Sequence, residues 1–382
     1  MDTKITITIN EPSDRLSNDY NIDFDINGDI KNGLHKTIVN SIRRILLSSI
    51  PTIAFRTDMD SKDLHIIKNT TSLHNEFIEN RIGLIPLYID PSTYKKQYLF
   101  KLIIDGSNTD KPFKRVYMND FNIYPLKDGI VIDEENSNID TNNYDLQKPL
   151  SIEEKKKLFR PFVYNKKDYY CLITELKTTT SSIQQELEIV GIPRISTASE
   201  DSRWQAVSCA NYSFKRDPEL FEKIIREKII VNEIPEEDQE EYKKSMAISE
   251  SERYYHRDEN CEPYWYNFKI NSVHYLSSKD LFTTSCQIII DQLELLKEEL
   301  PKIISGEDSL FTLKTNENIY TLSIDGYNDT IGSIIQYYIS THLIDEDSDF
   351  MVCGYNKVHP LEELIVFNIS FNTMKKSIIE LN

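Results

Sequence analysis

Two segments near opposite ends of the chain follow one pattern, and this repeat constrains the fold more than any other feature. Residues 37–43 (TIVNSIR) and 330–336 (TIGSIIQ) each follow a strand-like segment and a glycine-containing turn, and each continues into an apolar helix. An amphipathic helix must bury its apolar stripe against a neighbouring element. The repeat therefore predicts two similar α/β units that flank an insert and that could pair within the chain.

The N-terminal part changes its hydrophobic period in a way that indicates strands followed by a helix. Apolar and polar residues alternate over 4–9 and 22–26, which predicts two half-buried antiparallel strands. A helix follows, whose stripe comprises Leu34, Ile38, Ile42, Ile45 and Leu46. Pro51 ends this helix, a strand is expected over 52–56, and Gly83 and Pro86 break a short helix within 76–87.

The C-terminal part returns to regular periodicity after a loop-rich stretch. A strand from Tyr266 precedes a long helix that Pro301 ends, and a hairpin is expected from strands at 311–314 and 319–324. A second apolar helix carries Ile331, Ile334 and Ile335, and a final strand covers 364–371.

These elements predict an α+β fold whose 382 residues form two or three domains. Residues 1–88 with 264–304 form the first unit, residues 89–263 an inserted β-rich domain, and residues 305–382 the second unit. Within the insert, the acidic or Asn-rich stretches 133–145 and 233–241 are expected to be solvated loops.

Charge and composition exclude several classes of function. Lys and Arg number 44 against 62 Asp and Glu, and a net charge of −18 repels phosphate backbones. The longest apolar run, 82–89, is too short to span a bilayer, and the first ten residues lack the features of a signal peptide. The five cysteines form no chelating pair, so we expect reduced, mostly buried thiols in an intracellular compartment.

One short motif suggests a metal site. Asp23, Asp25 and Asn27, followed by Gly28, fit the first half of a calcium-binding loop, but Leu34 occupies the twelfth position, where a bidentate carboxylate is required. A magnesium triad that includes Asp29 would also need a different spacing. Glycine-rich phosphate loops and histidine pairs with metal-binding spacing are absent from the sequence, so no cofactor and no metal are expected.

Two adjacent arginines, Arg43 and Arg44, lie in the C-terminal half of the first apolar helix. Adjacent helical residues point about 100° apart, so at most one of the two lies at the centre of the buried stripe. They either complement the helix dipole or bind a partner's carboxylates and carbonyls.

Several of these segments resemble subunits of multisubunit RNA polymerases. Residues 40–52 (NSIRRILLSSIPT) resemble the assembly helix of the α subunit and of its archaeal D and eukaryotic third-subunit counterparts, and residues 76–87 are similar to a second signature of the eukaryotic and archaeal branch. Residues 204–208 (WQAVS) resemble, more distantly, a Lys-Trp-Ser-Pro segment of the family's inserted domain. Residues 329–332 and 353–362 resemble the smaller partner, the archaeal L or eukaryotic eleventh subunit. The resemblance thus implies a fusion of both types in one chain, as in polymerases of large DNA viruses.

The chain departs from the family pattern at three places. It lacks the cysteine cluster that often binds zinc or an iron–sulfur group in the inserted domain, and Ser333 and Gln336 replace the Asn and Arg of many relatives. The long C-terminal helix of the small partner is expected to be short here, because about eleven residues follow Phe371.

The resemblance implies a non-catalytic assembly-platform subunit of a DNA-directed RNA polymerase that holds the two large catalytic subunits. The chain would be no enzyme by itself, would also contact small polymerase subunits, and would meet DNA only through the complex, away from membranes. Within that complex it would be a monomer with an intramolecular pseudo-dimer. It would act inside the cell or, if viral, in the virion and the host cytoplasm or nucleus.

The resemblance also assigns residues to these roles. The assembly residues are Asn40, Arg43, Arg44, Glu76, Arg81, Gly83, Pro86, Gly332, His359 and Pro360. The pseudo-dimer core is formed by Ile38, Ile42, Ile45, Leu46, Ile331, Ile334 and Ile335. The three arginines are expected to contact the large subunits, and Arg44→Ala to weaken assembly more than fold stability. Two alternatives stay open: a metal-dependent enzyme that uses Asp23, Asp25 and Asp29, and a DNA-binding regulator.

Overall fold

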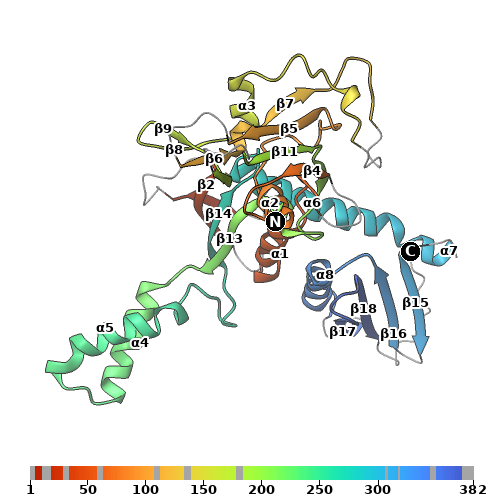
Figure 1. The fold of residues 1–382 in the computed structure, drawn as a ribbon. Helices are drawn as coiled ribbons and strands as arrows, with labels where there is room; N and C mark the ends of the chain where they lie inside the picture. Colours follow the sequence, from red (N-terminus) through yellow and green to blue (C-terminus); the bar gives the residue numbers. More distant parts are fainter. Residues whose placement is uncertain are drawn as a thin grey trace. The chain divides into compact units, whose positions relative to one another are not determined.

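The computed structural model describes residues 5–10, 19–28, 34–57, 63–106, 112–132, 139–177, 184–305, 309–316, 319–344 and 350–371 (Figure 1). Its packing divides the chain into two compact units. Unit 1 comprises Met1–Leu46, Cys209–Asn271 and Ser278–Asn382, and unit 2 comprises Leu47–Ser208 and Ser272–Ser277. Both units combine helices with antiparallel sheets, which confirms the α+β class.

The first sheet of unit 1 has the strand order β1-β2-β14-β13. Its strands are β1 (Thr6–Ile9), β2 (Asn21–Asn27), β13 (Val207–Phe214) and β14 (Trp265–Ser272), and its helices are α1 (Lys36–Ser48) and α6 (Ser278–Glu299). Phe24 lies opposite Phe268 in the β2–β14 register, and both rings are buried. Phe282 of α6 packs edge-on against Phe24, with ring centroids 5.2 Å apart. Alternation along the strands thus places the aromatic residues on the face that α6 covers.

The second sheet of unit 1 has the order β15-β16-β18-β17. It is formed by β15 (Phe311–Asn316), β16 (Ile319–Asp325), β17 (Phe350–Lys357) and β18 (Leu364–Phe371), accompanied by α7 (Lys302–Ser305) and α8 (Asp329–His342). In both sheets the strands therefore follow the order first, second, fourth, third along the chain. Leu296, near the end of α6, packs into the core of the second sheet with Ile331, Ile365 and Phe367. The single helix α6 thus contributes to the cores of both sheets.

A helical hairpin lies between β13 and β14, where the sequence predicted an acidic loop at 233–241. It consists of α4 (Pro218–Val231) and α5 (Gln239–Ser249), which are joined by the 3₁₀ turn η5 (Glu236–Asp238). Ile225, Ile229 and Met246 form its small core. Residues 233–241 form the mostly exposed connection between the two helices and the start of α5, so the expectation of a solvated loop is confirmed for most of this stretch, whereas the flanking helices were not predicted.

Unit 2 is built around a sheet of order β4-β11-β5-β7, with three two-stranded ribbons, β10-β6, β12-β3 and β8-β9. Its strands are β3 (Thr52–Ala54), β4 (Leu64–Asn69), β5 (Tyr98–Asp105), β6 (Phe113–Tyr117), β7 (Asn122–Pro125), β8 (Phe162–Tyr164), β9 (Lys167–Tyr169), β10 (Leu172–Lys177), β11 (Glu186–Gly191) and β12 (Arg194–Ser196). Its helices are α2 (Asn75–Gly83) and α3 (Ile152–Leu158). Further 3₁₀ turns are η2 (Met118–Asp120), η3 (Thr141–Asn143) and η4 (Ser202–Trp204) in unit 2 and η6 (Ser251–Arg253) in unit 1.

The boundaries of the compact units differ from those expected from the sequence for an insert at 89–263. Unit 2 begins at Leu47, because β3 and β4, which precede the expected insert, pair with β12 and β11 inside it. Residues 209–263 belong to unit 1, because β13 is the edge strand of its first sheet. Strand pairing over long sequence distances, which local periodicity does not report, sets both boundaries.

Three further expectations concern the cysteines, membrane spans and residues outside the description. All five thiols are free, but only Cys353 is buried and Cys171 and Cys261 are exposed, so the expectation of mostly buried thiols was wrong. Among the helices that the structure describes, none combines the length and apolar content that crossing a bilayer requires. Asp29, the first part of the 133–145 stretch and the expected C-terminal helix lie outside the described residues.

Candidate interaction site

Helix α1 presents one buried face within unit 1. Val39, Ser41, Ile42, Ile45 and Leu46 are buried, whereas Ile38 is only partly buried. The buried positions follow the three- and four-residue spacing of one helical stripe. Ser41 is the polar member of this stripe, and a buried hydroxyl needs a hydrogen-bond partner.

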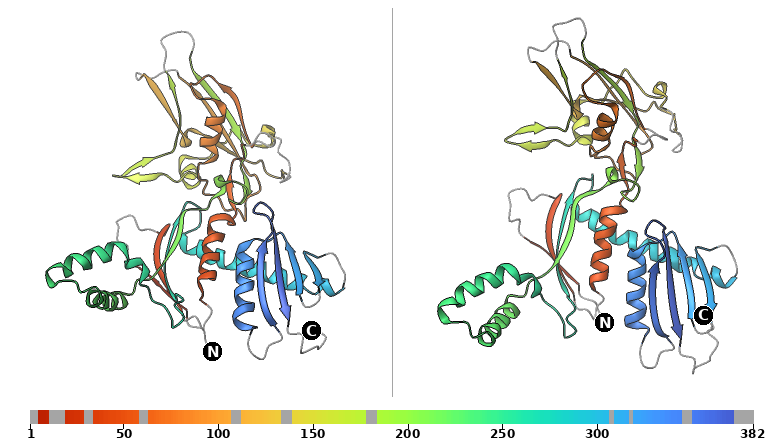
Figure 2. Two further views of the ribbon diagram at one scale, coloured as in Figure 1. Left: turned by 90° about the horizontal axis from the view of Figure 1, so that it is seen from below. Right: turned by 60° about the horizontal axis from the view of Figure 1, so that its bottom comes forward.

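The polar member of this stripe contacts the first turn of α8, and Figure 2 shows α1 and α8 side by side. The Ser41 hydroxyl donates to the carbonyl oxygen of Thr330 over 3.3 Å, and Arg44 Nε donates to Thr330 Oγ1 over 2.8 Å. Thr330 is 4% exposed, and its backbone N–H donates to the N-cap residue Asn328. One threonine thus connects the cap of α8 to two residues of α1 that lie 286 or more positions away.

His35, just before α1, makes a second contact with α8. Its ring stacks on Tyr337 with centroids 4.0 Å apart and planes 6° apart. His35 Nε2 lies 3.5 Å from Glu262 Oε2, and Lys36 Nζ lies 2.7 Å from the same oxygen. Burial lowers the pKa of His35, and the Glu262 carboxylate partly opposes this effect.

Gly332 lets α8 approach the second sheet closely. A Cβ atom at this position would lie 2.8 Å from Cδ2 of Tyr355 in β17. Ile331 and Ile334 are buried and Ile335 is partly buried, so α8 also presents an apolar stripe. Ile331 packs into the core of its own sheet.

Arg43 and Arg44 have different surroundings. Arg43 Nε donates to Asn40 Oδ1 one turn earlier over 3.0 Å, and within the described part of the chain this is the one hydrogen bond of its side chain. Burial raises the pKa of Tyr212, and the charge of Arg43 acts to lower it, so the guanidinium lies near β13. Arg44, in contrast, is bonded to α8. Within the described ranges, no group forms a hydrogen bond with the terminal amines of Arg43.

The second predicted signature, α2 and the loop after it, lies in unit 2. Ile78, Glu79, Ile82 and Gly83 are buried. Arg81 Nη1 donates to the carbonyl oxygen of Ile173 in β10 over 2.8 Å, and a Cβ on Gly83 would lie 3.2 Å from the carbonyl oxygen of Phe55. Glu76 is exposed and Pro86 is partly buried. Arg81 and Gly83 thus have packing roles within unit 2, and contacts of this segment with other subunits stay a prediction.

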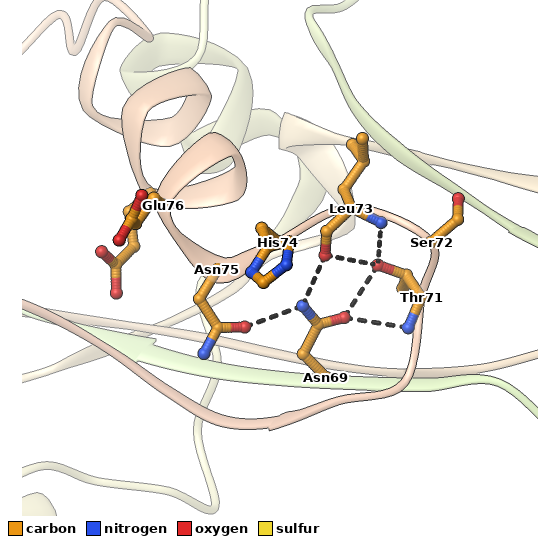
Figure 3. A pocket seen from close by; sticks show the side chains of 8 residues that line it. Asn69, Thr71, Ser72, Leu73, His74, Asn75 and Glu76 are labelled. Atoms are coloured by element: carbon orange, nitrogen blue, oxygen red, sulfur yellow. Dashed lines mark hydrogen bonds between the residues drawn. The ribbon is translucent and has the colours of Figure 1, made fainter.

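An open pocket of about 580 Å³ lies at the N-terminal end of α2 (Figure 3). It is lined by Asn69, Thr71, Ser72, Leu73, His74, Asn75, Glu76 and Glu79. Asn69 Nδ2 donates to the carbonyl oxygen of Leu73 and to Asn75 Oδ1, and Thr71 donates to Asn69 Oδ1 from both its backbone N–H and its hydroxyl. These bonds join the lining groups to one another and fix the turn between β4 and α2. We therefore assign these lining residues a structural role at the start of the second predicted signature.

His359 and Pro360 lie in the exposed turn between β17 and β18. The backbone N–H of Leu361 donates to His359 Nδ1, and Lys357 Nζ donates to the carbonyl oxygen of Pro360. The two residues therefore shape a surface turn, and their role in assembly stays a prediction.

Basic side chains lie beside Asp23 and Asp25, the two described carboxylates of the alternative metal site. Lys215 Nζ lies 2.5 Å from Asp25 Oδ2 and Lys269 Nζ 3.2 Å from Asp23 Oδ2, while Asn10 and Asn267 donate to both carboxylates. Burial acts to raise the pKa of Asp25, but these hydrogen bonds outweigh it and lower the pKa. Two ammonium groups thus occupy positions beside the carboxylates that a metal ion would need. No cluster of three or more potential metal ligands occurs in the described ranges.

Sequence patterns predicted the helices of this site but not the polar contacts between them. Thr330 and Ser41 fell within the repeated motif without an assigned role, and His35, Glu262 and Tyr337 carried no signal. Contacts over more than 200 residues leave no periodicity in a single sequence.

Comparison with known proteins adds independent findings. Residues 31–293 match the family described as the RNA polymerase Rpb3/Rpb11 dimerisation domain. The chain is 37% identical over 70 residues to the rpac1 subunit of DNA-directed RNA polymerases I and III of Dictyostelium discoideum, a match that covers 18% of this chain and 17% of that protein. It is 39% identical over 62 residues to the DNA-directed RNA polymerase subunit Rpo3 of Methanosphaera stadtmanae, covering 16% and 21% of the two chains. The human RPAC1 subunit is 33% identical over 63 residues, or 16% of each chain. The matched segment thus spans about a fifth of the length of these relatives.

Proposed function

Because the chain belongs to the RNA polymerase Rpb3/Rpb11 dimerisation-domain family, we propose that it is a non-catalytic subunit on which a multisubunit DNA-directed RNA polymerase assembles. The relatives described above are subunits of such polymerases by name. The chain would hold the two large catalytic subunits and contact small ones, and DNA would be met only through the complex.

The observation that carries this proposal is the contact of α1 with α8 in unit 1. Ser41 and Arg44 both bond to Thr330, and His35 stacks on Tyr337. We propose that these helices belong to two dimerisation units, a third-subunit (archaeal D) type and an eleventh-subunit (archaeal L) type, which pair within one chain. The identical strand order of the two sheets supports this assignment.

Fusion of the two dimerisation units in one chain would make their association independent of protein concentration. Two partners joined by a short connection meet at an effective concentration on the order of millimolar. In this chain α6 enters the core of the second sheet, so the connection is itself structured. A pair of units with only micromolar intrinsic affinity would then stay associated at any protein concentration.

Arg43 is the residue that the geometry favours for contact with a large subunit. Asn40 orients its guanidinium through Nε, which leaves the two terminal amines for bidentate binding of a carboxylate or of carbonyl groups. Arginines that anchor an interface often contribute 2 kcal/mol or more by alanine substitution, which corresponds to about 30-fold in affinity.

The proposal is tested by purifying the tagged chain from its native or infected cell at high salt and identifying the polypeptides bound to it by mass spectrometry. We expect two much larger chains with RNA polymerase sequence signatures, in equal amount to the tagged chain. Recovery of the chain alone would refute the assembly role.

A matched pair of variants makes the test specific. Arg43→Ala should reduce recovery of the large chains several-fold, whereas Arg226→Ala, an exposed arginine on α4, should leave it unchanged. Equal recovery with both variants would remove Arg43 from the interface, while the proposed function itself would rest on the wild-type result.

A further inference from the structure

The hairpin β8–β9 of unit 2 exposes an unusual amount of apolar surface. Phe162, Val163, Tyr164 and Tyr169 are 63%, 59%, 59% and 50% exposed. Phe162 pairs with Tyr169, and Tyr164 pairs with Lys167 across the hairpin, so the three aromatic rings share one face. Val163 pairs with Asp168 and lies on the other face. In Figures 1 and 2 the hairpin projects from the rest of unit 2. A two-stranded ribbon with exposed aromatic side chains is typical of a segment that a partner covers.

The turn of this hairpin keeps a lysine where the backbone favours glycine. Asn165 and Lys166 have φ angles of 48° and 60°, the positive values that a type I′ hairpin turn requires at both central positions. Asparagine tolerates this conformation, but glycine is preferred at the second position, and a lysine there is strained. The sequence thus retains a charged side chain at the tip at a cost in backbone energy.

Local charge around the hairpin is opposite to that of the whole chain. Residues 148–169 contain seven Lys or Arg and three Asp or Glu, in a protein whose net charge is −18. Lys156 pairs with Asp168, and Lys155 donates to backbone carbonyl groups. Lys157, Lys166 and Lys167 are exposed, and no described group forms a hydrogen bond or ion pair with their ammonium groups. Lys167 lies on the aromatic face opposite Tyr164, and Lys166 lies at the turn, so the hairpin carries positive charge beside its aromatic rings.

We propose that the β8–β9 hairpin docks into an apolar groove with an acidic rim on a protein partner, which is another subunit of the polymerase; this assignment rests on the proposed function. Aromatic side chains are enriched at the centres of protein interfaces, and charge complementarity at the rim selects the partner. A single-stranded nucleic acid is the less favoured occupant. A protein groove can bury the exposed Val163 on the opposite face together with the rings, whereas base stacking would leave Val163 exposed, and the net charge of −18 opposes a polyanion.

The test uses the polymerase complex purified through the tagged full-length chain. Tyr164 is replaced by the photoreactive amino acid benzoylphenylalanine, the complex is irradiated, and the adducts are identified by mass spectrometry. The same replacement of Ile103, which is 63% exposed in β5 of the same unit, serves as the control position. We expect the Tyr164 position to form an adduct with one protein, in a segment rich in Asp and Glu, and the Ile103 position to form none with that segment.

Two further variants separate docking from folding. Phe162→Ala should lower the adduct yield about tenfold, whereas Ile103→Ala, which removes an equally exposed side chain, should not change it. Lys166→Gly should leave the melting temperature of the chain unchanged or raise it, because it relieves the strained turn, and yet should lower the adduct yield several-fold. If the hairpin had only a structural role, Lys166→Gly would not lower the adduct yield while the melting temperature stays the same or rises.

The possible outcomes decide the proposal. An adduct with nucleic acid, an adduct in a basic protein segment, or no adduct at the Tyr164 position would overturn it. Absence of the large chains from the preparation would count against the proposed function, whereas their presence without a Tyr164 adduct would overturn the hairpin assignment alone.

Discussion

Breaking the hydrogen bond between Arg44 and Thr330 tests whether the contact of α1 with α8 stabilises unit 1. The perturbation is a double-mutant cycle of Arg44→Ala and Thr330→Val, since valine keeps the shape of threonine but removes its hydroxyl. Arg44 Nε lies 2.8 Å from Thr330 Oγ1, and Thr330 is 4% exposed. The bond is therefore well formed and largely shielded from water.

The magnitude follows from the burial of the two partners. A hydrogen bond that involves a charged group contributes about 1.5–3 kcal/mol, and the partial exposure of Arg44 moves the expected coupling energy to about 1–2 kcal/mol. Arg44→Ala also removes the packing of the aliphatic stem, so the single substitution should lower the free energy of unfolding by about 2–3 kcal/mol. The contact with Thr330 thus changes the expectation from the sequence that Arg44→Ala would affect assembly more than stability.

The assay is urea unfolding of the four proteins of the cycle, followed by circular dichroism. A parallel cycle of Arg43→Ala with Thr330→Val is the control and should be additive, because Arg43 bonds to Asn40 in its own helix. A coupling energy for Arg44 and Thr330 below about 0.3 kcal/mol, within the usual limit of additivity, would refute the argument.

Three further perturbations test other parts of the fold. Gly332→Ala places a Cβ 2.8 Å from the ring of Tyr355 and should destabilise unit 1 by about 1–3 kcal/mol, and thermal melting should show recovery when Tyr355→Leu is added. Burial lowers the pKa of His274 to about 4, so the native state disfavours its protonation. The contribution of neutral His274 to the free energy of unfolding should be complete above about pH 6.5, and up to about 3 kcal/mol should be lost towards pH 4. Denaturant titrations of His274→Gln should not show this loss. Lys215→Met leaves the carboxylate of Asp25, 6% exposed, without its ammonium partner and should lower the free energy of unfolding at pH 7 by about 1–3 kcal/mol; an unchanged urea midpoint would contradict this.

Local periodicity predicted the elements that carry the site. The helices α1, α2, α6 and α8 and the hairpin β15–β16 occur close to where the sequence placed them, because each has an apolar stripe or an alternating pattern within one window. Pro51 and Pro301 mark the helix ends as expected, since proline cannot continue a helix. Elements of this kind need no knowledge of distant parts of the chain.

Features that depend on distant partners were not predicted. The pairing of β4 with β11 and the place of β13 in the first sheet set the unit boundaries, and no local pattern reports them. The helices α4 and α5 were overlooked because their short apolar stripes lie among many charged residues of both signs. Burial keeps His274 neutral, and its tautomer depends on the carbonyl of Pro51, to which Nε2 donates, and on the N–H of Leu276, which donates to Nδ1.

The two adjacent arginines show most clearly what the structure adds to the sequence. Their adjacency on one helix established that they point in different directions, but not which of them faces a partner. The structure gives Arg44 a partner within the chain, Thr330, whereas no described group bonds to the terminal amines of Arg43. Loss of Arg44 should therefore reduce the stability of unit 1, and loss of Arg43 should reduce recovery of the large polymerase chains with little change in stability. Because the two residues differ by one position, the comparison separates folding from assembly within a single turn of α1.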